Sequence, residues 1–294
     1  MKSELSFDLL FRALAENRLL HTCDGPTYEI CRAAAGDLLE HCQLRETTPK
    51  PFAFGPFGEL AFPYHAMGAR DTVDLFGLDE LIIFAFYWAN RGQYRRALDI
   101  GANVGLHSIV MARCGFAVTA FEPDPQHFEW LSQNLQLNGC AAVRPVQAAV
   151  SNHSGQMDFV RVLGNTTGSH LAGAKDSYGD VQGFPVRVEN FADIVADADL
   201  VKIDAEGHEP EILFAAPPGT WERCDAVLEV GSAKNAVRIF ERFQKAEVNL
   251  FAQKIGWNRV CRLDQIPTSH REGSLFISHR GKMMWDTLAA EGAS

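Results

Sequence analysis

The sequence lacks the features that mark several large classes of protein. None of its seven cysteines stands in a C-x-x-C pair, and their number is odd, so neither a disulfide framework nor a zinc site is expected. The longest apolar run, residues 81–89, is about half the length that crosses a membrane. The opening residues carry acidic groups among the apolar ones, unlike a secretory signal. We therefore expect a soluble, cytoplasmic protein with reduced thiols and no membrane partner.

An excess of positive charge is also missing. The formal net charge is -10 at pH 7, whereas a general nucleic-acid binder needs a basic face that neutralises phosphates. The 294 residues contain no internal repeat and no compositionally biased segment. A chain of this length can bury one large core and carry a small appendage. These bounds favour a globular protein with a small-molecule ligand and exclude a nucleic-acid partner.

Residues 97–124 predict the first half of a nucleotide-type binding unit. The expected elements are a strand at 97–100, a turn at 101–105, a helix at 106–113 and a strand at 117–121. Glycines at both ends of the turn leave no side chain between the backbone and a ligand. The turn is therefore the first candidate binding site.

The identity of this ligand follows from what the turn does not contain. A dinucleotide fingerprint needs three glycines, and Asn103 and Leu106 occupy the second and third of those positions. Asp99, at the end of the first strand, would repel a pyrophosphate and attract a cation. Glu122, at the end of the second strand, is placed to accept hydrogen bonds from ribose hydroxyls. S-adenosylmethionine carries a sulfonium, an ammonium and no phosphate, so it fits better than NAD or ATP.

Strand and helix patterns continue to alternate after this unit. Further helices are expected at 125–138, 209–216 and 233–246, and further strands at 143–150, 200–204 and 226–230. Two last strands, near 258–262 and 274–279, should pair antiparallel at one edge. The predicted fold class is α/β, with a doubly wound, mostly parallel sheet.

Two segments lie outside this alternation. Residues 1–75 are expected to form a mainly helical appendage with a small hairpin at 49–63, and residues 76–294 the main domain. Helices at 7–20 and 27–44 could support a homo-oligomer. The apolar face of the second helix should contain Ile30, Ala33, Ala34, Leu38 and Leu39.

The second segment is an insertion at residues 151–190. It contains a predicted strand at 156–162, a long glycine-rich loop that ends near residue 183, and an edge-type strand at 185–189. The loop is either a lid over a ligand or a mobile surface loop without ligand contacts, and the sequence leaves both interpretations open.

A second polar cluster follows the strand at 200–204. It contains Asp204, Glu206, Gly207, His208 and Glu209, and Glu229 ends the next strand. Ligands of open α/β sheets bind outside the carboxyl ends of the strands, where the strand order reverses. The cluster should therefore share a crevice with Asp99.

Four motifs together resemble the FkbM family of S-adenosylmethionine-dependent methyltransferases. They are DIGANVG, AFEPDP, AVSNHSG and, most specifically, VKIDAEGHEPEIL, within residues 97–230. The resemblance implies a class I, Rossmann-like methyltransferase that acts on a hydroxyl oxygen, in sugar or natural-product decoration. It also implies a donor site for the methionine part, made by Asp99, Gly101, Ala102, Asn103 and Gly105, with Glu122 at the ribose. His208 departs from the family, in which a small residue is common.

The expected chemistry follows from the donor and the acceptor. An alcohol must lose a proton, so Asp204 and His208 are the first candidates for a base, with Glu206 and Glu229 as orienting partners. The same groups could instead hold Mg²⁺, although no metal ligand is assigned. Two alternatives remain: a nicotinamide-dependent oxidoreductase, and a non-catalytic module that binds S-adenosylmethionine or a partner protein.

Overall fold

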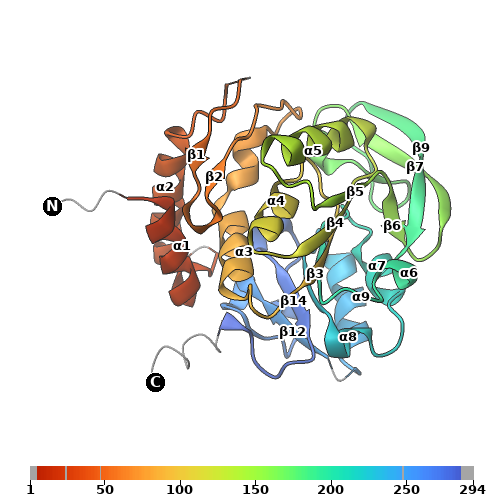
Figure 1. Ribbon diagram of the computed structural model, residues 1–294. Coiled ribbons are helices and arrows are strands. Elements are labelled where there is room, and N and C mark those ends of the chain that lie inside the picture. The colour runs from red at the N-terminus through yellow and green to blue at the C-terminus, as the bar shows by residue number, and fades with distance from the viewer. Residues whose placement is uncertain (1–4, 24, 47, 247, 286–294) are drawn as a thin grey trace.

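The main sheet of the protein has eight strands (Figure 1). The computed structural model describes residues 5–23, 25–46, 48–246 and 248–285. From one edge to the other, the strands are β13 (Asn258–Arg259), β12 (Asn249–Ala252), β14 (Leu275–Ser278), β11 (Asp225–Leu228), β10 (Leu200–Ile203), β3 (Arg96–Ile100), β4 (Ala117–Phe121) and β5 (Arg144–Val146). The strands from β11 to β5 are parallel, and β14 is antiparallel to both of its neighbours. The predicted class I, Rossmann-like sheet with an antiparallel edge is confirmed.

Helices cover both faces of this sheet. One face packs against α3 (Leu78–Ala89), α4 (Leu106–Arg113) and α5 (Pro125–Leu137), and the other against α6 (Phe191–Ile194), α7 (Glu209–Phe214), α8 (Thr220–Arg223) and α9 (Ala233–Phe243). Successive strand residues point to opposite faces, so Ala97 joins one buried cluster and Leu98 the other. No helix in the described part of the chain is long and apolar enough to span a bilayer.

The strand order reverses between β3 and β10. From β3 the chain adds β4 and β5 on one side, and it later places β10 and β11 on the other. A reversal of this kind leaves a crevice outside the carboxyl ends of the two central strands. The turn after β3 and the polar cluster after β10 meet there, because the Asp204 backbone N–H donates to the Ile100 carbonyl at 3.0 Å.

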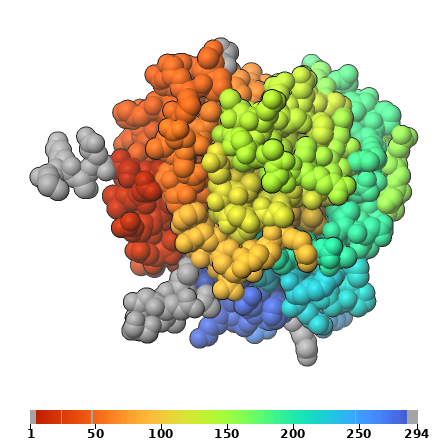
Figure 2. Space-filling model, viewed as in Figure 1, coloured from red at the N-terminus to blue at the C-terminus, as the bar shows by residue number. Residues whose placement is uncertain are grey.

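The N-terminal segment packs along one flank of the molecule (Figures 1 and 2). It contains α1 (Phe7–Glu16), α2 (Pro26–Glu40) and the antiparallel pair β1 (Phe52–Ala53) and β2 (Glu59–Leu60), so the predicted hairpin is confirmed. Leu14 and Phe54 belong to the same buried cluster as Ile82 and Ile109 of the main domain. The segment thus shares the core of that sheet face, and a domain boundary at residue 75 stays a prediction.

The predicted apolar face of α2 is wrong in part. Its buried residues are Tyr28, Cys31, Ala35 and Leu39, whereas Ile30 is 72% exposed. The Tyr28 hydroxyl donates to Asp79 of α3 at 2.9 Å, so the ring of Tyr28 faces the core. Ile30, two residues later, therefore points away from it.

The insertion forms a second sheet, which contains the two strands predicted at 156–162 and 185–189. Its strands, in the order β6-β9-β7-β8, are β6 (Ala149–Ser151), β9 (Val181–Asn190), β7 (Gly155–Val162) and β8 (His170–Leu171). The expected strand at 143–150 is therefore two strands in two sheets. The expected edge strand, β9, instead lies between two neighbours, parallel to β6 and antiparallel to β7. Near the β13 edge of the main sheet, β12 was not predicted. It lies between β13 and β14, so these two last strands do not pair with each other as expected.

Candidate active site

The donor turn, residues 101–105, is pressed against the loop that follows β10. The backbone N–H groups of Gly101 and Ala102 both donate to the Phe121 carbonyl, at 3.0 and 2.9 Å. Gly101 has φ +75°, and a Cβ atom there would lie 1.8 Å from the Asp204 carbonyl oxygen. Only glycine permits this approach. Gly105, at φ +91°, begins α4, and a Cβ there would lie 2.5 Å from the Leu131 side chain.

Asp99 lies beneath the donor turn and has no exposed surface. Its Oδ2 accepts a hydrogen bond from Ser108 Oγ at 2.5 Å. Its Oδ1 lies 3.6 Å from Nζ of Lys202, the residue that pairs with it across β3 and β10. Asp99 was expected to attract a cationic ligand, but the cation beside it is Lys202 of the chain itself. Asp99 can act on a bound donor only through the turn that follows it.

Glu122 holds the other side of the donor turn. Its carboxylate accepts hydrogen bonds from the backbone N–H groups of Asn103 and Asp124, both at 2.8 Å. Burial raises the pKa of Glu122 to about 8. A carboxylate has further acceptor sites, so ribose hydroxyls can still be bound. Asn103, at φ +52°, has a buried side-chain oxygen with no protein partner among the described residues. This orphaned acceptor fits an N–H or O–H group of a nucleoside-type donor.

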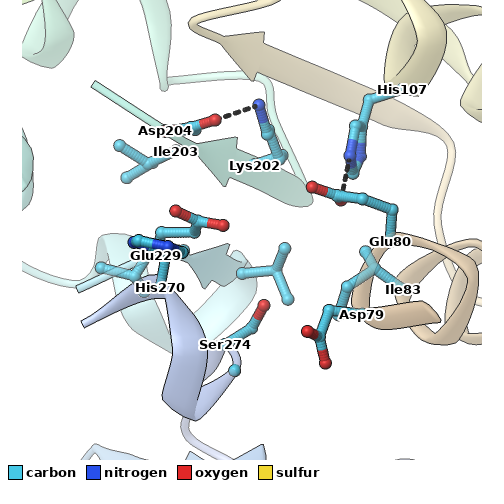
Figure 3. A pocket seen from close by; sticks show the side chains of 13 residues that line it. Asp79, Glu80, Ile83, His107, Lys202, Ile203, Asp204, Glu229, His270 and Ser274 are labelled. Carbon is cyan, nitrogen blue, oxygen red and sulfur yellow. Dashed lines mark hydrogen bonds and ion pairs between the residues drawn. The ribbon is translucent and has the colours of Figure 1, made fainter. Parts of the chain in front are cut away.

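A pocket opens beside the donor turn, at the ends of β10 and β11 (Figure 3). Its polar lining residues come from five parts of the chain and are Asp79, Glu80, His107, Lys202, Asp204, Glu229, His270 and Ser274. Asp204 and Glu229 are the only predicted catalytic residues that line it. The pocket thus brings two of the four predicted catalytic residues together beside the donor turn.

Lys202 is the cation that pairs with Asp204. Its Nζ lies 3.5 Å from Asp204 Oδ2 and donates to the Gly101 carbonyl at 3.1 Å. Burial alone would lower the pKa of Lys202, but the carboxylates of Asp204 and Asp99 raise it. Sequence reasoning missed this residue. The available signal was a charged side chain in the middle of the apolar strand LVKID.

Glu229 differs from Asp204 in its surroundings. Burial, followed by repulsion from the neighbouring Asp204 and Glu80, raises the pKa of Glu229 well above its ordinary range. Asp204, by contrast, forms an ion pair with Lys202. Both carboxyl groups line the pocket, so the structure brings the predicted base Asp204 and its predicted orienting partner Glu229 together there.

Three residues of the acidic block, residues 204–209, mainly make structural contacts: Glu206, His208 and Glu209. Glu209 is buried and accepts hydrogen bonds from the backbone of Ala205 and Gly207, at 3.2 and 2.9 Å. Glu206 pairs with Lys175 of the insertion, and burial, with repulsion from Asp204, raises the pKa of Glu206 to about 7.

His208 does not reach the pocket, contrary to its predicted role as a base. Its ring is buried, and Nε2 lies 2.8 Å from Ser151 Oγ of β6. Burial also lowers the pKa of His208. The residue thus joins the loop after β10 to the small sheet, and its place before α7 directs its side chain away from Asp204 and Glu229.

Two further pocket residues come from α3, and no motif pointed to them. Glu80 Oε2 lies 2.7 Å from His107 Nε2, and the Tyr87 hydroxyl lies 3.1 Å from His107 Nδ1. Asp79 accepts hydrogen bonds from Tyr28 of α2 and from Gln253. The N-terminal segment is therefore bonded to one wall of the pocket. Acidic residues are common in the first turn of any helix, so their role could not be read from the sequence.

The described residues include no group of three or more His, Cys, Asp or Glu side chains that could hold a metal ion. The suggested Mg²⁺ site thus gains no support from the arrangement of these side chains.

Comparisons with known proteins bear on the same region. The family model for the methyltransferase FkbM domain matches residues 99–259, more than half of the chain. Methyltransferase sdnD of Sordaria araneosa is 27% identical over 161 residues, which cover 42% of this chain and 61% of the relative. Hexuronic acid methyltransferase AglP of Haloferax volcanii is 28% identical over 120 residues, which cover 39% and 47%. The chain thus spans about half to three fifths of the length of these relatives.

Among solved structures, an S-adenosylmethionine-dependent methyltransferase from Agrobacterium tumefaciens is similar to 79% of this chain, over 71% of its own length. The sequence identity is 11% and the TM-score is 0.41.

Proposed function

This chain belongs to the FkbM methyltransferase family, and from that premise we propose that it transfers a methyl group from S-adenosylmethionine to a hydroxyl oxygen of a small polar acceptor. The acceptor class that we propose is a sugar or a natural-product intermediate. The observation that carries the proposal is the contact between the donor turn and the loop after β10. Because these two segments touch, a donor bound on Gly101 and an acceptor bound beside Asp204 would share one crevice.

The residues that would hold the donor belong to the turn and to its support. The backbone at residues 101–105 would carry the methionine part, with Glu122 at the ribose and the unpaired oxygen of Asn103 as a further acceptor. When bound, S-adenosylmethionine supplies a methyl group that its sulfonium already activates. The main task of the protein is then to align the acceptor at attack distance and to exclude water.

The acceptor hydroxyl must lose its proton, and Glu229 is our candidate for this step. Its side chain lines the pocket together with Asp204, in the crevice that would receive the acceptor. Asp204, held by Lys202, would orient the hydroxyl. Replacement of Glu229 by Gln should lower the methyl-transfer rate by about 10²- to 10⁴-fold, while Glu241→Gln on α9 serves as a control.

Donor binding provides the direct test. Isothermal titration with S-adenosylhomocysteine should show binding to the wild type that weakens at least about tenfold in Glu122→Ala, since a charge-assisted hydrogen bond contributes about 1.5–3 kcal/mol. Glu129→Ala, at an exposed position on α5, should bind as the wild type does. No binding to the wild type would reject the proposal.

The acceptor class needs a separate assay. Donor consumption with a panel of neutral sugars and uronic acids, followed by mass spectrometry of the products, should place the methyl group on oxygen. Methylation of nitrogen or carbon instead would contradict the oxygen assignment. A parallel assay with EDTA decides whether turnover needs a divalent cation.

A further inference from the structure

Lys202 occupies a central position in the crevice. It lies in β10, beside Asp99 of β3, on the sheet face that α3 and α4 cover. Its side chain is only 10% exposed. A buried lysine is costly unless its ammonium group is fully paired, so its partners indicate what it does.

The ammonium group of Lys202 meets three oxygen atoms from three places. It donates to the Gly101 carbonyl at 3.1 Å and lies 3.6 Å from Asp99 Oδ1 and 3.5 Å from Asp204 Oδ2. The Gly101 carbonyl accepts a hydrogen bond, and the two carboxylate oxygens lie at ion-pair distance from the same ammonium group. One cation thus contacts the floor of the donor turn, the turn itself and the acceptor side of the pocket. Figure 3 shows the last of these contacts, between Lys202 and Asp204.

These contacts go beyond the neutralisation of Asp99. The Gly101 carbonyl carries no net charge, so the hydrogen bond from Lys202 to it is not part of that neutralisation. The contact with Gly101 instead ties the backbone of the donor turn to β10. The contact with Asp204 places a pocket carboxylate relative to that turn.

We propose that Lys202 is a positioning residue that sets the distance between the donor turn and Asp204, and so aligns donor with acceptor. This inference rests on the proposed function, because it assumes that the donor binds on the turn. If Lys202 only balances the buried charge of Asp99, removal of both charges together should restore every property of the site.

The test uses four variants of the full chain: Lys202→Met, Asp99→Asn, the double variant, and Lys50→Met as a control on the surface. Urea unfolding reports stability, and isothermal titration with S-adenosylhomocysteine reports the donor site. Lys50 pairs with Glu46 and is 58% exposed, so Lys50→Met should leave the affinity unchanged. Lys202→Met should lose stability, because it leaves Asp99 buried without its ion pair.

The double variant decides the role of Lys202. We expect it to be more stable than Lys202→Met, since Asp99 no longer lies beneath the turn as a buried charge without its ion pair. We also expect it to bind S-adenosylhomocysteine at least about tenfold more weakly than Asp99→Asn does, because the turn has lost its tie to β10. Equal affinities of the double variant and Asp99→Asn would overturn the inference and leave the proposed function standing. A wild type that does not bind S-adenosylhomocysteine would overturn both.

Discussion

The donor turn and the acidic block face the same crevice, but they use their polar groups differently. In the turn, backbone N–H groups make the contacts, to the Phe121 carbonyl and to Glu122. In the block, side chains bind its backbone and the surrounding chain, as Glu209 and His208 do. Only Asp204 of the block lines the pocket. A dense run of ionisable residues can therefore be mostly scaffold.

A substitution that disrupts the contact between the donor turn and the acidic block should cause the largest loss of stability. Gly101→Ala would place a Cβ atom 1.8 Å from a backbone oxygen, at φ +75°. We expect a loss of about 3 kcal/mol or more in the free energy of unfolding, measured with urea. Gly115→Ala is the matched control, because its φ is +88° but no atom lies within 4 Å. It should cost about 1 kcal/mol. Equal costs would mean that the turn and the block are not in contact.

The donor side should also show a pH dependence through Glu122. Folding raises the pKa of this carboxyl from 4.5 to about 8 by burial. Its contribution to stability is therefore fully present below pH 4.5 and is lost as the pH rises through about 8. The stability of the wild type relative to Glu122→Gln should fall by about 3 kcal/mol between about pH 5 and pH 8.

Urea unfolding at several pH values measures this difference. Glu129→Gln, at an exposed position on α5, controls for the loss of one negative charge. A stability difference between the wild type and Glu122→Gln that stays constant across this range would contradict the raised pKa of the buried Glu122 carboxyl.

Substitution of His208 in the acidic block should lower stability and leave donor binding unchanged. His208→Ala removes a buried ring and its hydrogen bond to Ser151, so we expect a loss of about 2 kcal/mol. The affinity for S-adenosylhomocysteine should stay within about twofold, since His208 does not line the pocket. A double-mutant cycle with Ser151→Ala isolates the pair. A tenfold loss of affinity in a well-folded His208→Ala variant would show that His208 contributes to donor binding, contrary to this prediction.

The smallest loss of stability is expected from a substitution in the ion pair that joins the acidic block to the insertion. The Lys175–Glu206 pair keeps 28% and 32% of its side-chain surfaces exposed, so solvent screens it. Lys175→Met should lower the free energy of unfolding by less than about 1 kcal/mol, and added salt should reduce the difference further. A loss of more than about 2 kcal/mol would show that the insertion is anchored here and that this ion pair is strong.

Local patterns predicted the central unit well. The strand, turn, helix and strand of residues 97–121 were expected within one residue of β3, α4 and β4. Apolar runs bounded by glycines define such elements without help from distant residues. In the insertion, strands were expected at 156–162 and 185–189, and the structure has both of them, within β7 and β9. The sheet that they form with β6 and β8, and the inner position of β9 in it, were not predicted, because they depend on pairing across about twenty residues of chain.

The sequence by itself determined the fold class, the donor turn and the family motifs, because all of these depend on spacing along the chain. Only the tertiary structure decided which polar residues face the pocket. Lys202 meets Asp99 because β3 and β10 are paired in that register, and Glu80 enters from a helix outside the motifs. His208 turns away because a β6 hydroxyl lies within hydrogen-bond reach. Side-chain neighbours across strands are set by register and packing, which no single stretch of sequence contains.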